Sequence, residues 1–143
     1  MFVKGKLMRE FVKPLAVASR CIGFEPVRWD GKIIPCKIIE DFKPFVNFLP
    51  VCPEVEIGLG IPREPIRVVK KNGQRKLLQP ATQKDFTKKM QQFIKKFLSE
   101  LPEIDGVILK SRSPSCGIRD VKIFSDIKED LPVSKGAGFF GEA

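Results

Sequence analysis

Residues 83–109, QKDFTKKMQQFIKKFLSELPEIDGVIL, contain the clearest helix and strand of the sequence. From Gln83 to Leu101, apolar residues recur every three or four positions and lysines fill the opposite face, which predicts an amphipathic helix. Thr82 and Asp85 form a predicted capping box at its start. A proline and an Asp-Gly pair end the helix, and the apolar run Val107-Ile108-Leu109 is typical of a central parallel strand. A helix that leads into such a strand indicates an α/β fold.

Further elements precede this helix. Residues 13–19 (KPLAVAS) predict a buried first strand, and residues 46–51 a second one. Between them, residues 33–45 have helical spacing, which two prolines confine to the middle of the stretch. Residues 66–78 predict a hairpin, because Asn72-Gly73 supplies the positive-φ residues of a tight turn. The order of elements therefore predicts an α/β sheet with a largely parallel centre.

Length and composition restrict the chemistry. A chain of 143 residues can sustain one core. It has 26 basic and 17 acidic residues, a net charge of +9, and neither histidine nor tyrosine. A Ser-His-Asp triad, a Cys-His pair and a histidine-ligated metal are therefore excluded. The charge is ordinarily a solvated basic surface, and RNA is the alternative partner, although no recognised nucleic-acid motif accompanies it.

The sequence predicts a cytoplasmic protein without a membrane span. No apolar run approaches the ~18 residues that a membrane helix needs. Met1 to Lys13 is basic and an apolar run follows, but that run is too short for an export signal. Arg20 also precedes Cys21, where a cleavage site needs a small residue. The four cysteines are accordingly expected to be thiols or metal ligands rather than two disulfides.

Three of the cysteines share one setting. Cys21, Cys52 and Cys116 each lie in a glycine- or proline-rich loop that follows a predicted strand. Because loops beyond the carboxyl ends of parallel strands converge at one edge, we expect these thiols to meet. Cys36 stands apart at the start of the helical pattern, and its simplest interpretation is a small buried hydrophobe.

Three thiolates could bind more than one kind of metal group. A structural zinc site needs four ligands, commonly in Cys-x-x-Cys pairs, and the sequence contains no such pair. A [4Fe-4S] cluster accepts thiolates from distant loops, and three of them leave one iron open to a substrate. A basic RNA-binding protein with a structural metal, and an iron–sulfur protein that carries sulfur or electrons, remain alternatives.

Several spaced motifs, in this order, resemble the DUF523 family, the thiouracil desulfidase group. The similarity spans roughly residues 13–138. The motifs are Arg20-Cys21-x-Gly23, Val27-Arg28-Trp29-Asp30-Gly31, Pro50-Val51-Cys52-Pro53-Glu54, Pro62-Arg63 and Lys110-Ser111-Arg112-Ser113-Pro114-Ser115-Cys116-Gly117.

The resemblance implies a single compact Rossmann-like α/β domain over residues 1–143, with a mainly parallel sheet and a β-hairpin insertion. It also implies a [4Fe-4S] cluster on Cys21, Cys52 and Cys116, with one iron lacking a protein ligand. The implied activity is removal of sulfur from a thiolated pyrimidine such as 2-thiouracil, as free base, nucleoside or tRNA residue.

This chemistry needs few further groups. A soft thione sulfur binds an open iron, water then attacks the ring carbon, and sulfur leaves as hydrosulfide without a redox change. Glu54 is the first candidate for the acid/base role and Asp30 the second. Alternatively, Glu54 is a helix N-terminal carboxylate, and Asp30 is a turn residue or a partner of Arg28. From the resemblance, Ser113 contacts the substrate, whereas the simpler reading is a serine that caps its own turn.

Overall fold

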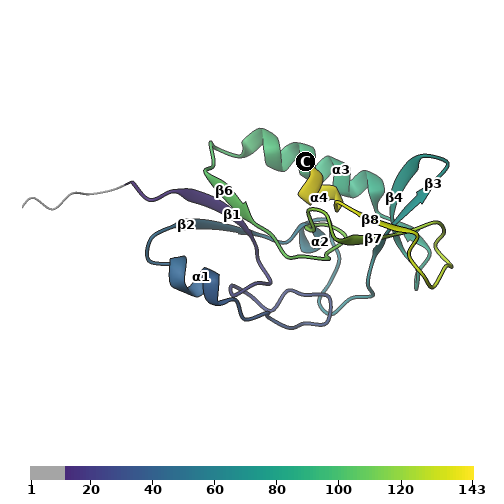
Figure 1. The fold of residues 1–143 in the computed structure, drawn as a ribbon, viewed down its shortest axis with the longest axis horizontal. Coiled ribbons are helices and arrows are strands. Elements are labelled where there is room, and N and C mark those ends of the chain that lie inside the picture. Colours follow the sequence, from purple (N-terminus) through teal and green to yellow (C-terminus); the bar gives the residue numbers. More distant parts are fainter. Residues whose placement is uncertain (1–11) are drawn as a thin grey trace, which may run out of the picture.

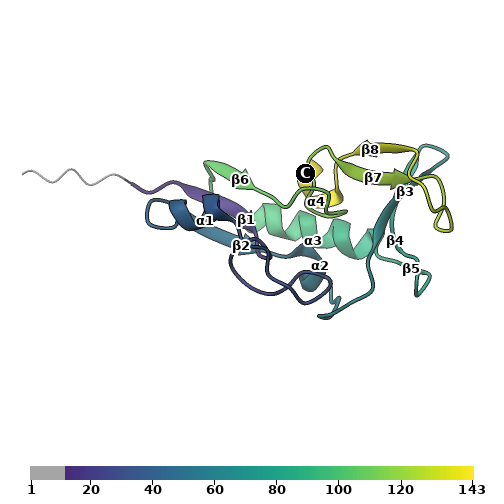
Figure 2. The ribbon, with the colours of Figure 1, turned by 60° about the horizontal axis from the view of Figure 1, so that its bottom comes forward.

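Two β-sheets lie at opposite ends of one long helix in the computed structural model, which describes residues 12–143 (Figures 1 and 2). The predicted basic N-terminal segment therefore lies almost entirely outside the described residues. No helix among residues 12–143 is long and apolar enough to cross a membrane.

The first sheet has three strands, all parallel. Ser19 lies opposite Val51, and Ala18 opposite Ile108, so the carboxyl ends of the strands meet at one edge. The sequence predicted all three strands but placed the last one centrally. This was wrong, because β1 pairs with both others, and Val107 on the edge strand is 47% exposed. In spatial order the strands are β2 (Asn47–Val51), β1 (Leu15–Ser19) and β6 (Gly106–Ile108).

The second sheet has five strands, and only the contact between β3 and β7 is parallel. The predicted hairpin is confirmed as β3 and β4, with Asn72 at φ 53° and Gly73 at φ 76° in the turn. β7 pairs with β3 and extends the hairpin into a larger sheet. In spatial order the strands are β5 (Lys84–Asp85), β4 (Gln74–Gln79), β3 (Arg67–Lys71), β7 (Val121–Phe124) and β8 (Ser134–Gly136).

The predicted amphipathic helix is α3 (Thr87–Glu100). It begins later than predicted because Lys84 and Asp85 pair with β4 as a strand. The capping box was also wrong: Phe86 is the N-cap and makes no side-chain cap, while Asp85 Oδ1 accepts a hydrogen bond from the Thr87 amide at 2.9 Å. The helix predicted within residues 33–45 is α1 (Lys37–Phe42), short as its prolines require.

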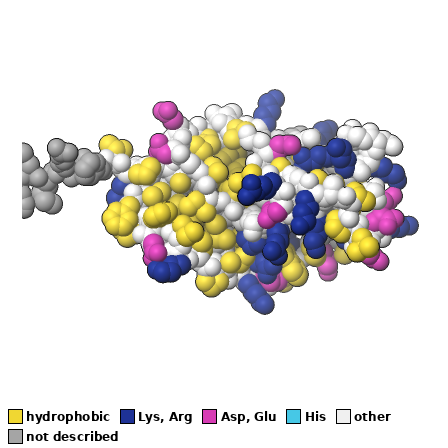
Figure 3. All heavy atoms as spheres, viewed as in Figure 1, with side chains coloured by type: hydrophobic (Ala, Val, Ile, Leu, Met, Phe, Trp, Pro, Cys, Tyr) yellow, Lys and Arg dark blue, Asp and Glu magenta, His cyan; other side chains and the backbone are white. Residues whose placement is uncertain are grey.

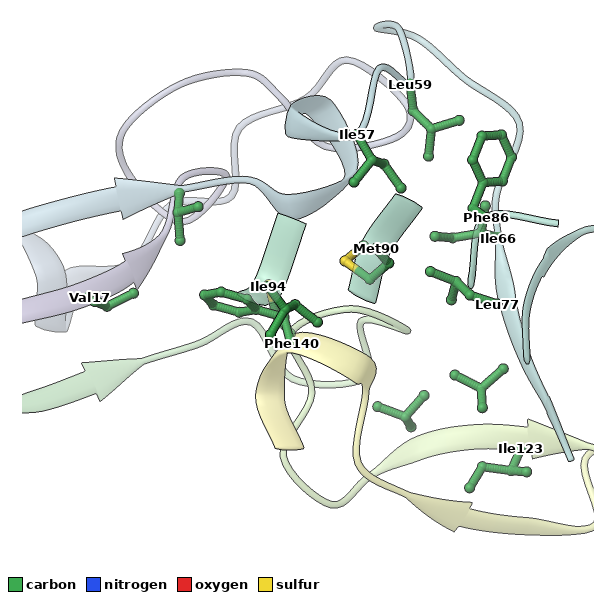
Figure 4. Close-up of a cluster of buried hydrophobic side chains, with 14 residues drawn as sticks. Val17, Ile57, Leu59, Ile66, Leu77, Phe86, Met90, Ile94, Ile123 and Phe140 are labelled. Carbon is green, nitrogen blue, oxygen red and sulfur yellow. The ribbon is translucent and has the colours of Figure 1, made fainter. Parts of the chain in front are cut away.

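The main core surrounds α3. Met90 and Ile94 on its buried face pack against residues of both sheets and against Phe140 of α4 (Phe139–Glu142) (Figure 4). Phe140 also contacts Phe97 edge to face, with ring centroids 5.3 Å apart. The terminal aromatic residues thus pack into the core, as the apolarity of phenylalanine favours. A smaller cluster of Ala18, Ile22 and Ile39 lies between the first sheet and α1.

Candidate functional site

The three loop cysteines line one cavity of about 220 Å³. Cys21 lies two residues beyond β1, and Cys52 follows β2 directly and caps the short helix α2 (Pro53–Glu56). Cys116 lies in the loop that connects β6 to β7. The loops meet because the strands before them are parallel neighbours of one sheet.

All three thiols are shielded from water. Cys52 and Cys116 are buried and Cys21 is half-buried. Burial raises the pKa of each thiol, that of Cys116 to about 12. For Cys21, burial is the main cause of the raised pKa and the charge of Cys52 adds to it. The thiols are therefore protonated at neutral pH until a cation displaces their protons.

The sulfur donors at the cavity are three cysteine thiols. Among residues 12–143, no group of three or more cysteine, aspartate or glutamate side chains is arranged so that it could hold a metal ion. Three thiols on separate loops around a common cavity fit a larger inorganic group, and thiolates are the ligands that iron–sulfur clusters use.

Glu54 is held inside the same cavity. It lies in the first turn of α2 and is only 8% exposed. Arg63 Nε donates to Glu54 Oε1 at 3.0 Å, and Ser115 Oγ donates to Oε2 at 3.1 Å. The carboxylate is therefore both a helix N-terminal acid and a cavity-lining group.

Ser113 lines the cavity with its hydroxyl oriented by the backbone. Its Oγ accepts hydrogen bonds from the amides of Ser115 at 3.2 Å and Cys116 at 3.0 Å. A hydroxyl has two acceptor lone pairs and one donor hydrogen. Since both lone pairs are engaged, the remaining capacity of Ser113 is to donate.

Asp30 and Cys36 lie outside this cavity lining. Asp30 Oδ2 accepts from Arg28 Nη1 at 2.6 Å, and Oδ1 accepts from the Lys32 amide at 3.1 Å. Asp30 thus holds Arg28, which does line the cavity. Cys36 is the N-cap of α1 and packs against the small cluster under that helix, which Cys21 also contacts, but Cys36 does not line the cavity.

Several lining residues had no assigned role in the sequence prediction. Ser19 ends β1, and its hydroxyl accepts a hydrogen bond from the Lys110 amide at 2.8 Å. Burial raises the pKa of the Cys116 thiol, and the Ser19 hydroxyl offsets only part of that rise. Trp29 contributes an aromatic surface. Their chain positions carry no periodicity that would have indicated these roles.

Positive charge dominates the cavity. Among the described residues 12–143, Glu54 is the one acidic side chain in the lining, against five basic ones. Seen from the front, Lys and Arg side chains gather over the middle and right of the molecule, whereas the left end over α1 is largely apolar (Figure 3). The basic lining residues are Arg20, Arg28, Arg63, Lys110 and Arg112.

These features define an α/β protein with a three-cysteine centre at the carboxyl edge of a parallel sheet. The family model described as 2-thiouracil desulfurase matches residues 16–143, and the chain belongs to this family. The family resemblance and the α/β fold class predicted from the sequence are thereby confirmed.

Two similar proteins extend this comparison. The uncharacterized protein YbbK of Bacillus subtilis is 29% identical over 110 residues, which cover 72% of this chain and 73% of YbbK. The solved structure of the [4Fe-4S]-dependent thiouracil desulfidase TudS superposes with a TM-score of 0.64 at 26% identity. The match covers 90% of this chain and 82% of TudS.

Proposed function

We propose that the protein removes sulfur from a thiolated pyrimidine with a [4Fe-4S] cluster on Cys21, Cys52 and Cys116, one iron of which lacks a protein ligand. Family membership and the similarity to TudS support this activity. The observation that carries it is the meeting of three loop cysteines with Glu54 and Ser113 around one cavity. The substrate is a free base, a nucleoside or a tRNA residue, and the reduced thiols suit a cytoplasmic enzyme.

Bound there, the cluster supplies a soft Lewis acid that polarises the thione C–S bond. The net reaction is hydrolysis: water contributes the new carbonyl oxygen, and sulfur departs as hydrosulfide. Ser113 Oγ donates its free hydrogen to a heteroatom of the substrate ring, because its lone pairs are already engaged by backbone amides. A donor fixed in this way stabilises negative charge that develops on the ring.

Glu54 is the proposed acid/base. Its oxygens each accept one hydrogen bond, which leaves further lone pairs that can take the proton from the attacking water. Asp30 contributes indirectly by fixing Arg28 beside Trp29 at the cavity, where the Arg28 guanidinium carbon lies 5.6 Å from the centre of the Trp29 ring. These two side chains provide a flat, cationic wall for a pyrimidine.

Turnover tests the proposal directly. The protein is purified and reconstituted anaerobically, then incubated with 2-thiouracil, 2-thiouridine or thiolated tRNA without any electron donor. We expect equal amounts of sulfide and desulfurised product from at least one substrate. A cluster-containing protein that converts none of them would contradict the enzyme assignment and favour a carrier of sulfur or electrons. A colourless protein that retains only zinc would favour the RNA-binding alternative.

A further inference from the structure

Arg63 is the most enclosed of the three cavity arginines that form ion pairs. Its side chain is 6% exposed, compared with 21% for Arg20 and 36% for Arg28. Arg20 and Arg28 pair with Glu56 and Asp30 nearer the surface. An arginine enclosed to this degree needs its N–H groups satisfied, so its partners indicate its role.

The guanidinium of Arg63 touches both the proposed acid and a proposed cluster ligand. Nε donates to Glu54 Oε1 at 3.0 Å, and Nη2 lies 4.0 Å from Cys52 Sγ, at the outer limit of a hydrogen bond to sulfur. Nη1 donates to the Gly60 carbonyl at 3.2 Å, which fixes the plane of the fork. Lysine could not reproduce this arrangement, because its ammonium is a single point donor.

The same network reaches all three cysteine loops. The Arg63 amide donates to the carbonyl of Trp29, in the loop that follows Cys21, at 2.8 Å. Glu54 extends the network to the Cys116 loop, because its Oε2 accepts a hydrogen bond from Ser115, the residue before Cys116. One buried ion pair thereby ties together segments that are far apart in the chain.

We propose that Arg63 is a positioning residue, whose guanidinium orients Glu54 through Oε1 and donates an N–H to the Cys52 sulfur, coupling the acid to the cluster ligand. This inference rests on the proposed function, because it requires a cluster on Cys52. A positive charge and an N–H donor beside a ligating sulfur raise the reduction potential of a cluster. Arg63 therefore leaves a signature that packing alone would not produce.

The test measures the reduction potential of the reconstituted cluster by anaerobic titration in R63Q, R63K and E54Q. R63Q removes both the charge and the donor, so its potential shifts to more negative values. R63K keeps the positive charge but loses the several N–H donors of the guanidinium, so its potential shifts in the same direction by a smaller amount. E54Q leaves Arg63 uncompensated beside Cys52 and shifts the potential to more positive values. R28Q is the matched control, because it removes a more exposed cation from the same cavity, and its shift is smaller than that of R63Q.

Potentials of R63Q and R63K equal to that of the unmodified protein would overturn the inference. Variants that fold, by circular dichroism, but hold no cluster while R28Q does would support a role of Arg63 in placing Cys52. If R63Q fails to fold, R63K and E54Q carry the test, and an unchanged potential in both would overturn the inference. Failure of the proposed function looks different, because the unmodified protein would then lack a cluster or turnover.

Discussion

Ser113 shows how backbone contacts can restrict one side chain to a single chemical role. Two amides occupy its lone pairs, so it can only donate toward the cavity. We expect Ser113→Ala to lower kcat about 10²- to 10³-fold, the usual cost of removing one fixed donor to a developing oxyanion. Iron content should not change, because Ser113 is not a proposed ligand. Ser99→Ala, at the exposed end of α3, is the control. Full turnover by Ser113→Ala would exclude its role as a donor.

The two candidate carboxylates can be separated by amide substitution. Glu54→Gln retains groups that can face Arg63 and Ser115 but cannot take a proton, so turnover should fall about 10²- to 10⁴-fold. Asp30→Asn acts only through Arg28, and we expect a smaller loss that appears mainly in KM. Steady-state kinetics on cluster-matched samples measures both effects. A larger fall in kcat for Asp30→Asn than for Glu54→Gln would reverse the assignment.

At the scale of elements, the C-terminal segment fixes the loop that carries Cys116. Phe140 and Gly141 both donate to the Ser115 carbonyl, at 2.8 and 2.9 Å, and Gly138 donates to the Gly117 carbonyl at 2.7 Å. A Cβ on Gly141 would strike the carbonyl oxygens of Cys116 and Gly117. The glycines of this segment therefore permit a backbone contact that a larger residue would prevent.

Gly141→Ala tests this contact. We expect it to lower the free energy of unfolding by about 1–3 kcal/mol, the typical cost of overpacking. It should also lower the iron content after reconstitution, because the substitution disturbs the backbone hydrogen bonds that hold the Cys116 loop. Gly106→Ala is the matched control, since nothing lies within 4 Å of its Cβ position. Urea denaturation and iron analysis that fail to distinguish the two variants would contradict the role given to the segment.

The sequence predicts an element only where the local residue pattern is strong enough to specify it. The helix over residues 87–100, the Asn72-Gly73 hairpin and three parallel strands have strong local patterns, and the structure contains them all. Strands β7 and β8 went unpredicted. Strand β8 (Ser134–Gly136) is polar and pairs only through tertiary context, and β7 is only four residues long. The edge position of β6 likewise depends on partner choice rather than on its own apolar run.

The candidate site was also only partly predictable from the sequence. The meeting of the cysteine loops could be inferred because it follows from the parallel order of the strands. The hydrogen bond between Glu54 and Ser115 could not, because it joins side chains 61 positions apart that have no periodic relation. Such contacts depend on how α2 and the Cys116 loop pack together.

At the scale of the whole molecule, α3 joins the two sheets. Met90 is fully buried in the core that both sheets share. We expect Met90→Ala to destabilise the protein by about 2–5 kcal/mol, and Met90→Leu by less than about 1.5 kcal/mol. Thermal unfolding of the two variants measures this difference. Equal Tm values for the two variants would contradict the central position of this residue.

The central claim is that three cysteines, and not the fourth, hold an iron–sulfur cluster at the shared cavity. Iron and acid-labile sulfide, measured after anaerobic reconstitution of the four single Cys→Ala variants, test it most directly. We predict about four iron and four sulfide per chain for Cys36→Ala, as for the unmodified protein. Cys21→Ala, Cys52→Ala and Cys116→Ala should each lose the intact cluster while remaining folded. A full cluster in any of those three variants, or loss of the cluster in a folded Cys36→Ala variant, would contradict the account.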